Sequence, residues 1–222
     1  MPTAKERLSH LLVLASEGPA ERASLAGELA DLLLDWPADC PPSMRTPLVS
    51  LFSMTVREAD SQTRAKLAAR LGGHGELPLD LVNEFYLYAP APVRREILTR
   101  NELAGDADED VAAPDAVKLL SAARNTMNGE FAEHFGASMG IAPQTARAIL
   151  ADTSAEALAV LCKGAHLDRA MFSALTILKG RSQSDAAAQL SVYDSVPQHA
   201  AERLTRFWQT RSAPAQYIRA AE

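Results

Sequence analysis

The amino-acid sequence predicts an all-α protein. Apolar residues recur at intervals of three and four along almost the whole chain, and no stretch shows the sustained alternation that a β-strand would produce. The composition agrees, because hydrophobic residues make up 47% of the chain, many of them Ala and Leu, and aromatic residues only 5%. At 222 residues the chain is long enough to bury a real core.

The first half contains six predicted helices, separated by short segments rich in proline, glycine or acidic residues. Thr46 is placed to cap the third helix, with Pro47 in its first position. The apolar stripes that identify the six helices are Leu8, Leu11, Leu12 and Ala15; Leu25, Leu29, Leu32 and Leu33; Leu48, Leu51, Phe52 and Val56; Ala65, Leu67, Ala68 and Leu71; Leu81, Val82, Phe85 and Tyr86; and Val93, Ile97 and Leu98.

The second half contains a further series of predicted helices, of which the first three lie around residues 115–127, 129–139 and 143–151. Residues 153–156 (TSAE) match a capping box, in which Thr153 and Glu156 would satisfy free amides at the start of the next helix. Residues 182–185 (SQSD) resemble a second capping box. The last long helix follows Pro197 and carries an apolar stripe formed by Ala201, Leu204, Phe207 and Trp208.

Two stretches of the first half align at an offset of 30 residues. TRAKLAAR, from Thr63, and VRREILTR, from Val93, place Arg64 with Arg94, Leu67 with Ile97, and Arg70 with Arg100. The preceding helices correspond at an offset of 31, and ERASLAGEL, from Glu21, is a degenerate third member. Each unit is then a helical hairpin that buries its apolar face by stacking on its neighbours.

This repeat resembles a HEAT-type helical repeat. In that family a small apolar residue and an Arg begin the second helix, and an Asp at the preceding turn pairs with a neighbouring Arg. Asp60 and Arg64 fit this pattern, whereas the second unit has residues 89–92 (APAP) in place of the Asp, and the period is shorter than usual. The resemblance implies stacked helical hairpins that bind other proteins.

The acidic segment GDADEDVAAP divides the chain, because it holds four acidic residues between a glycine and a proline and should be exposed. The predicted organisation is therefore HEAT-like repeats over residues 1–104, an acidic linker over 105–114 and a helical subdomain over 115–212. Residues 213–222 form a tail that either frays or docks through Tyr217 and Ile218.

A second resemblance covers roughly the last half of the chain and is carried by the region from Met139 to Leu178. A glycine-containing turn leads into a short helix, then into an Ala- and Leu-rich helix, and then into a junction that reads AHLDRAMF from Ala165. This resembles the alphaproteobacterial domain-of-unknown-function family numbered 2336, in which the junction is similar to GL-x-R-x-x-F. His166 stands where that family has glycine. The resemblance implies an all-helical fold, no established activity and no catalytic residue.

Composition and motifs argue against several function classes. The net charge is -6, and residues 1–110 hold 11 Lys and Arg against 18 Asp and Glu, so attraction to nucleic acid is not expected. No serine-nucleophile, kinase, dinucleotide or metal-binding spacing occurs, which predicts no enzyme, no cofactor and no metal. Cys40 and Cys162 lie far apart and are expected to be buried thiols. Without an apolar run long enough to span a bilayer, the chain is expected to be cytoplasmic.

Three surfaces are candidates for binding. The first is the stretch FGASMGIAPQTARAIL, from Phe135, which has the layout of a helix-turn-helix but offers only Arg147 as an outward cation. The second is a basic stripe on the repeats, where Arg70, Arg95 and Arg100 would receive an acidic segment of a protein partner. The alternative for this stripe is structural: Arg64 and Arg94 tie turns together, and the other cations form a solvated face. The third is the pair Phe207 and Trp208 on the last helix, which either closes the core or binds a partner or a second copy of the chain as a homodimer.

The preferred hypothesis is a non-enzymatic protein–protein interaction or regulatory module of unknown partner. The alternative is a nucleic-acid-binding protein, either a regulator that uses the helix-turn-helix-like corner or a HEAT-like base-repair enzyme. A hydrolase whose site is assembled from distant residues also remains open, because the sequence alone does not exclude it.

Overall fold

Every element in the described part of the chain is a helix, as the sequence predicts. The computed structural model describes residues 10–11, 19–38, 40–105, 114–125, 130–178 and 186–212. The chain divides into two compact units, residues 1–97 and 98–222. The predicted capping box at 182–185 and the tail at 213–222 lie outside the described residues, as does most of the predicted acidic linker.

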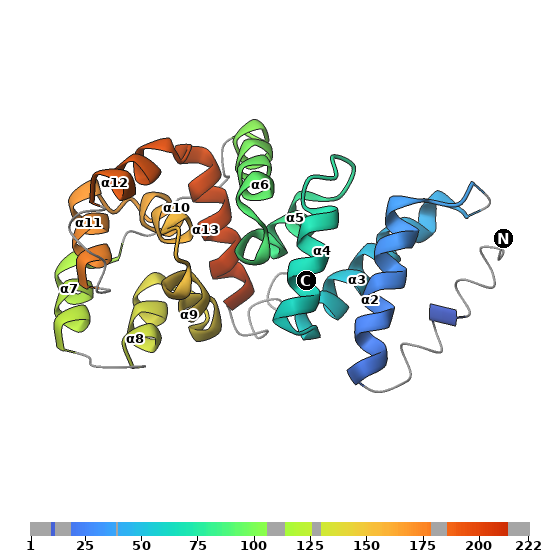
Figure 1. Cartoon of the computed structure of the whole chain (residues 1–222), viewed down its shortest axis with the longest axis horizontal. Coiled ribbons are helices and arrows are strands. Elements are labelled where there is room, and N and C mark those ends of the chain that lie inside the picture. The colour runs from blue at the N-terminus through green and yellow to red at the C-terminus, as the bar shows by residue number, and fades with distance from the viewer. Residues whose placement is uncertain are drawn as a thin grey trace, which may run out of the picture. The chain divides into compact units, whose positions relative to one another are not determined.

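The first unit is a series of antiparallel helices with an aromatic core (Figure 1). Phe52 and Phe85, whose ring centroids lie 6.2 Å apart, are fully buried at the centre of this core. Helix α2 packs on α3 and α4, α3 packs on α5, and α4 packs on η2. The elements are α2 (Pro19–Leu34), η1 (Pro42–Met44), α3 (Arg45–Glu58), α4 (Ser61–Leu71), α5 (Leu79–Glu84), η2 (Tyr86–Tyr88) and α6 (Ala91–Leu103), the last of which crosses the division between the units.

The second unit is organised around α10, a helix buried on nearly every side. Residues 157–162 are all fully buried, which is the pattern of a helix at the centre of a bundle. Helix α13 packs on it most extensively, and α9, α11 and α12 contact it as well. The elements are α7 (Ala116–Asn125), α8 (Glu130–Met139), α9 (Pro143–Ala151), α10 (Glu156–Gly164), α11 (Arg169–Leu178), α12 (Ala186–Ser195) and α13 (Gln198–Ser212).

The 30-residue offset in the sequence corresponds to a contact that the structure repeats at the same offset. The Nε of Arg64 donates to the Ala59 carbonyl at 2.8 Å, and the Nε of Arg94 donates to the Ala89 carbonyl at 3.0 Å. The second bond goes seven residues back in each case, from Arg64 to the Arg57 carbonyl and from Arg94 to the Leu87 carbonyl. Buried and exposed positions also follow one another in the same order in residues 61–69 and 91–99.

Each repeated arginine therefore fastens the end of the preceding helix to the start of its own helix. Because guanidinium groups satisfy carbonyls that the helix end leaves free, this contact fixes the turn between the two helices of each hairpin. Arg64 also donates to the Tyr88 hydroxyl at 2.6 Å and lies 5.1 Å from the centroid of that ring. Arg64 thus ties the first hairpin to the second within this unit.

Asp60 has a different role from the one the HEAT resemblance implies. Its carboxylate does not pair with Arg64 but accepts hydrogen bonds from the amides of Gln62 and Thr63, and so caps α4. These bonds, together with one from the Thr63 hydroxyl, lower the pKa of Asp60 below its ordinary value. The predicted ion pair is wrong because this short side chain reaches the free amides at the start of α4 and accepts hydrogen bonds from them instead.

Two further cap predictions are wrong. Helix α3 begins at Arg45, directly after the 3-10 turn η1, and its N-cap residue Met44 makes no side-chain cap bond, so Thr46 does not cap it. Helix α10 is preceded by Ala155 in the left-handed conformation, with φ of 62°. The amides of Glu156 and Ala157 are satisfied by the side chains of Ser154 and Asp152, so the capping box at 153–156 does not form.

Removing the Arg64 guanidinium tests the repeated turn contact. We expect Arg64→Met to lower the free energy of unfolding by about 2 kcal/mol, because three hydrogen bonds from a charged donor are lost while the apolar stem remains. Urea denaturation checks this. Lys66→Met, two residues further along α4 at an exposed position, is the matched control and should change stability by less than about 0.5 kcal/mol. Equal losses in both variants would show that Arg64 does not fasten the turn.

Candidate functional site

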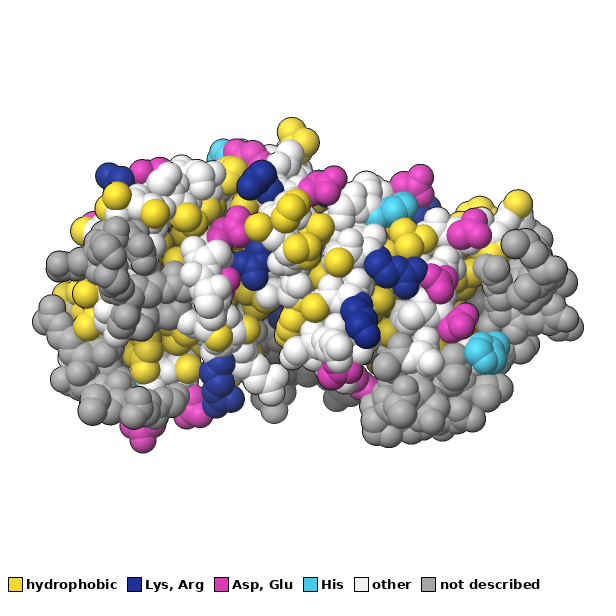
Figure 2. All heavy atoms as spheres, viewed as in Figure 1, with side chains coloured by type: hydrophobic (Ala, Val, Ile, Leu, Met, Phe, Trp, Pro, Cys, Tyr) yellow, Lys and Arg dark blue, Asp and Glu magenta, His cyan; other side chains and the backbone are white. Residues whose placement is uncertain are grey.

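The arginines of the predicted basic stripe are exposed or half-buried. Figure 2 shows Lys and Arg side chains interspersed with Asp and Glu side chains over the described residues on the face in view. Arg70 of α4 forms an ion pair with Asp31 of α2, and both side chains are about half exposed. Arg95 is exposed on α6, and Arg100 is half-buried on the same helix, beyond the division between the units.

The two aromatic candidates on α13 have different environments. Trp208 is 4% exposed and belongs to the core of the second unit, so its side chain is not presented to a partner. This favours the core-closing alternative for Trp208, since a side chain of that size stabilises most when it is fully enclosed. Phe207 is half-buried, and the Arg211 guanidinium lies 5.1 Å from its ring centroid. Of the pair, Phe207 is the one within reach of a partner.

The helix-turn-helix-like corner is formed by α8 and α9, as the sequence predicts. Gly140 adopts φ of 67° at the turn, where a residue with a Cβ would be strained. The Ile141 amide donates to the Gly136 carbonyl at 2.9 Å, and Gly136 allows the two helices to approach closely, because a Cβ there would lie 3.2 Å from that of Ala146. Gly140 is therefore explained by the conformation of the turn, and Gly136 by the close approach of the two helices.

The outward cation of this corner and its turn both have partners within the second unit. Arg147 pairs with Glu133 of α8 at 2.9 Å. The far end of α13 holds the turn itself: the Gln209 side chain donates to the Met139 carbonyl at 2.9 Å, and the Ala142 amide donates to the Ser212 hydroxyl at 2.5 Å. A DNA phosphate would therefore compete with Glu133 for the cation that the sequence singled out.

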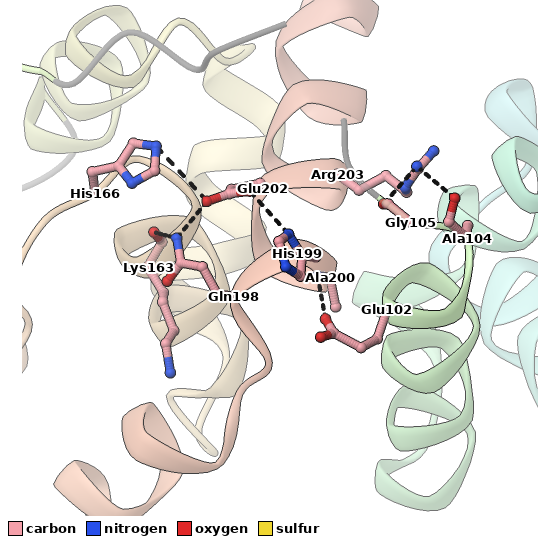
Figure 3. Close-up of polar contacts among 10 residues, drawn as sticks. All are labelled: Glu102, Ala104, Gly105, Lys163, His166, Gln198, His199, Ala200, Glu202 and Arg203. Atoms are coloured by element: carbon pink, nitrogen blue, oxygen red, sulfur yellow. Dashed lines mark hydrogen bonds and ion pairs between the residues drawn. The ribbon is translucent and has the colours of Figure 1, made fainter. Parts of the chain in front are cut away.

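A cluster of polar contacts joins several helix ends in the second unit (Figure 3). We call this cluster the helix-end junction. The Gln198 side chain donates both to the Lys163 carbonyl at the end of α10 and to the Glu202 carboxylate, at 3.2 and 2.6 Å. The Nζ of Lys163 donates to the carbonyls of Tyr193 and Val196 at the end of α12. A cation at the C-terminus of a helix is favoured by the helix dipole.

Two histidines flank Glu202 in this junction, as Figure 3 shows. The Nε2 of His166 lies 3.9 Å from one carboxylate oxygen of Glu202, and the Nδ1 of His199 lies 3.7 Å from the other. Both imidazoles are about half exposed. Within the described ranges, no group of three or more His, Cys, Asp and Glu side chains is arranged to hold a metal ion. His166 and His199 therefore each make a separate contact with the Glu202 carboxylate.

His166 occupies a backbone conformation that suits glycine. Its φ is 55°, its amide donates to the Lys163 carbonyl at 3.1 Å, and the Leu167 amide donates to the Cys162 carbonyl at 2.8 Å. These two bonds form the Schellman motif that ends many helices, with His166 in the left-handed position. This gives a physical reason for the glycine that the resembled family has at this position of the segment AHLDRAMF.

Replacing His166 with glycine should stabilise the protein. Relief of the left-handed conformation is worth about 1 kcal/mol, whereas the half-exposed contact with Glu202 contributes less. Thermal unfolding of His166→Gly is the measurement. The neighbouring Ala165→Gly is the control and should destabilise, because Ala165 has a negative φ of -93°. A loss of stability in His166→Gly would mean that the imidazole itself holds the junction.

Cys40 and Cys162 are both buried free thiols, which confirms their predicted burial. Burial raises the pKa of the Cys162 thiol above its ordinary value, because the charged thiolate loses its hydration there. A thiol held in its neutral form is a poor nucleophile. No helix in the described part of the chain combines the length and the apolar character that crossing a membrane requires.

The sequence did not single out most of the helix-end junction. Glu102, Gln198, Glu202 and Arg203 carry no local motif, and their contacts join segments up to 98 or 99 residues apart. Only His166 stood out, as the residue in place of the family's glycine. Of the predicted partner-binding residues, Arg100, Phe207 and Trp208 lie in this same unit, and none of them is among the residues drawn in Figure 3.

Comparison with known proteins supports the second resemblance. Residues 114–206 match the model of DUF2336, a family described as an uncharacterised protein conserved in bacteria. The match contains the whole region from Met139 to Leu178 that carries the resemblance in the sequence. No curated protein and no solved structure matches the chain.

Proposed function

We propose that the chain is a non-enzymatic protein–protein interaction module and that its first unit is a HEAT-like array. The observation that supports this most is the turn contact repeated at an offset of 30 residues, made by Arg64 in one hairpin and by Arg94 in the next. Hairpins that repeat in this way bury their apolar faces against one another and leave regular outer positions for binding. Regulation of the partner and a cytoplasmic location are part of the same proposal.

The docking positions are on the outer faces of α4 and of the first half of α6. Arg70 and Arg95 are exposed there, and the binding partner is an acidic segment of another protein. The existing pair of Arg70 with Asp31 does not prevent this, because exposed ion pairs contribute little and exchange partners readily. Arg100 is a further position on α6, and Phe207 is the apolar candidate on α13.

Affinity capture with a charge-reversed variant tests the proposal. The tagged chain is compared with Arg70→Glu/Arg95→Glu, and Lys118→Glu, an exposed position of the second unit, is the matched control. We expect proteins captured by the wild type and by the control to fall at least tenfold with the double variant. Equal capture by all three chains would contradict the docking positions, and recovery of nucleic acid alone would contradict the proposal as a whole.

The alternative function is nucleic-acid binding through the corner of α8 and α9. It is favoured by the glycine turn at Gly140 and by the exposed Gln144 and Arg147 at the start of α9. A mobility shift on duplex DNA that weakens with salt and is reduced in Arg147→Ala would support it. The negative net charge and the Arg147–Glu133 pair favour the protein-binding proposal.

A further inference from the structure

The end of α6 and the start of α13 cap each other. The Glu102 carboxylate, in the last turn of α6, accepts a hydrogen bond from the Ala200 amide in the first turn of α13 at 3.0 Å. In return, the Arg203 guanidinium of α13 donates to the carbonyls of Ala104 and Gly105 at the end of α6, at 3.0 and 2.8 Å. Figure 3 shows the two side chains reaching across in opposite directions. We call these contacts the reciprocal cap.

The charges in the reciprocal cap are matched to the helix ends. A carboxylate is favoured at the N-terminus of α13 and a guanidinium at the C-terminus of α6, because each opposes the partial charge of the helix dipole. Both groups satisfy backbone atoms that a helix end leaves without an intrahelical partner. The attachment is therefore made by charged side chains, whose contribution is weakened by salt.

Apolar burial adds little to this attachment in its final turn. Leu103 is 81% exposed, and Ala104 and Gly105 are exposed as well, with Gly105 in a left-handed conformation at φ of 80°. Leu98 and Asn101 are the buried residues of the segment. Segments with few buried apolar contacts and half-exposed polar anchors open locally before the rest of a domain unfolds.

Close apolar packing, and not charged side chains, attaches α13 to α10. Gly164 lies so close to α13 that a Cβ on it would be 2.3 Å from the Ala201 carbonyl oxygen, and the surrounding side chains are fully buried. Close apolar packing of this kind opens only with the core. The two contacts of α13 should therefore differ in how easily they are broken.

We infer that residues 98–105 are a latch, held to α13 by the reciprocal cap and released from it while the core of α10 and α13 stays folded. The last turns of α6 belong to the second unit, so release of the latch detaches these turns from the rest of that unit. The inference does not depend on which partner the protein binds, because it concerns contacts within residues 98–222 alone.

Hydrogen–deuterium exchange tests the latch in the full-length chain. We expect Glu102→Ala and Arg203→Met each to speed amide exchange in residues 98–105 about tenfold and to leave residues 156–164 of α10 unchanged. Arg206→Met is the matched control, because Arg206 is half-buried on the same helix one turn away and belongs to neither cap. The same selective acceleration, smaller in size, is expected for the wild type when the salt concentration is raised to about 1 M, where the Debye length falls to about 3 Å.

Two results would overturn the inference. The first is exchange in residues 98–105 that is no faster in the cap variants than in Arg206→Met. The second is acceleration in α10 equal to that in residues 98–105, which would show that the segment opens only together with the core. If a variant does not fold, the salt series on the wild-type chain decides between these outcomes by itself.

Discussion

Replacing Gly164 with alanine is expected to destabilise the second unit by about 3 kcal/mol, at the upper end of what overpacking costs. An added Cβ would lie 2.2 Å from the Thr205 hydroxyl oxygen and 2.3 Å from the Ala201 carbonyl oxygen. Backbone atoms of a packed helix do not move aside as a flexible side chain does, so α10 and α13 would have to separate. Chemical denaturation followed by circular dichroism measures this loss.

Gly27→Ala is the opposite control for Gly164→Ala. Gly27 lies within α2 and has no atom within 4 Å of an added Cβ, so alanine there should stabilise by about 1 kcal/mol through its higher helix propensity. If Gly164→Ala is as stable as the wild type, the close approach of α10 and α13 is not the contact that holds the second unit together.

Replacing Trp208 with alanine is expected to cost about 3–5 kcal/mol, because the side chain is 4% exposed and its removal leaves a cavity in the core. This prediction separates the two roles that the sequence allowed for the aromatic pair. A partner-binding tryptophan at the surface could be removed with little effect on stability, whereas a core tryptophan could not. Thermal and urea unfolding of Trp208→Ala without any partner present measure the difference.

Phe207→Ala serves as the neighbouring comparison. Phe207 is half-buried, so its removal should cost less, about 1–2 kcal/mol by the area it shields from water. A larger loss for Phe207→Ala than for Trp208→Ala would contradict the burial described for these two residues. Comparable binding of any captured partner by Phe207→Ala and the wild type would remove Phe207 from the candidate binding residues.

The sequence was most informative where apolar spacing and local repeats decide the structure. The spacing of Leu67 and Ile97 placed both residues on buried faces, and the offset that aligned them also aligned Arg64 with Arg94. Reading these two arginines as ties between turns is consistent with the carbonyl contacts that they make. These features follow from periodicity within one or two helices, which a sequence displays directly.

Caps and boundaries were harder to predict, because competing side chains stand within a few residues of each helix start. Thr153 fits a capping box on paper, but the left-handed Ala155 turns the chain so that Asp152 and Ser154 reach the free amides instead. No sequence signal marks the division between Ile97 and Leu98, which lies inside α6.

The helix-end junction was beyond the reach of sequence reasoning for a geometric reason. Lys163 and Gln198 bind carbonyls at the ends of α12 and α10, which only the tertiary fold of the second unit brings together. No periodic signal marks a side chain whose partner is a backbone carbonyl on another helix. His166 could be noticed only against the glycine of a resembled family, and its left-handed backbone supplies the physical meaning of that difference.

The most direct test of the proposed docking is the hydrogen-exchange footprint of the chain with a captured partner bound. Binding at the outer faces of the repeats predicts slower exchange in residues 61–71 and 91–97, with residues 156–164 of α10 unchanged. It also predicts that the footprint disappears in Arg70→Glu/Arg95→Glu. Protection confined to residues 143–151 at the α8–α9 corner, or a footprint that persists in the double variant, would contradict the account.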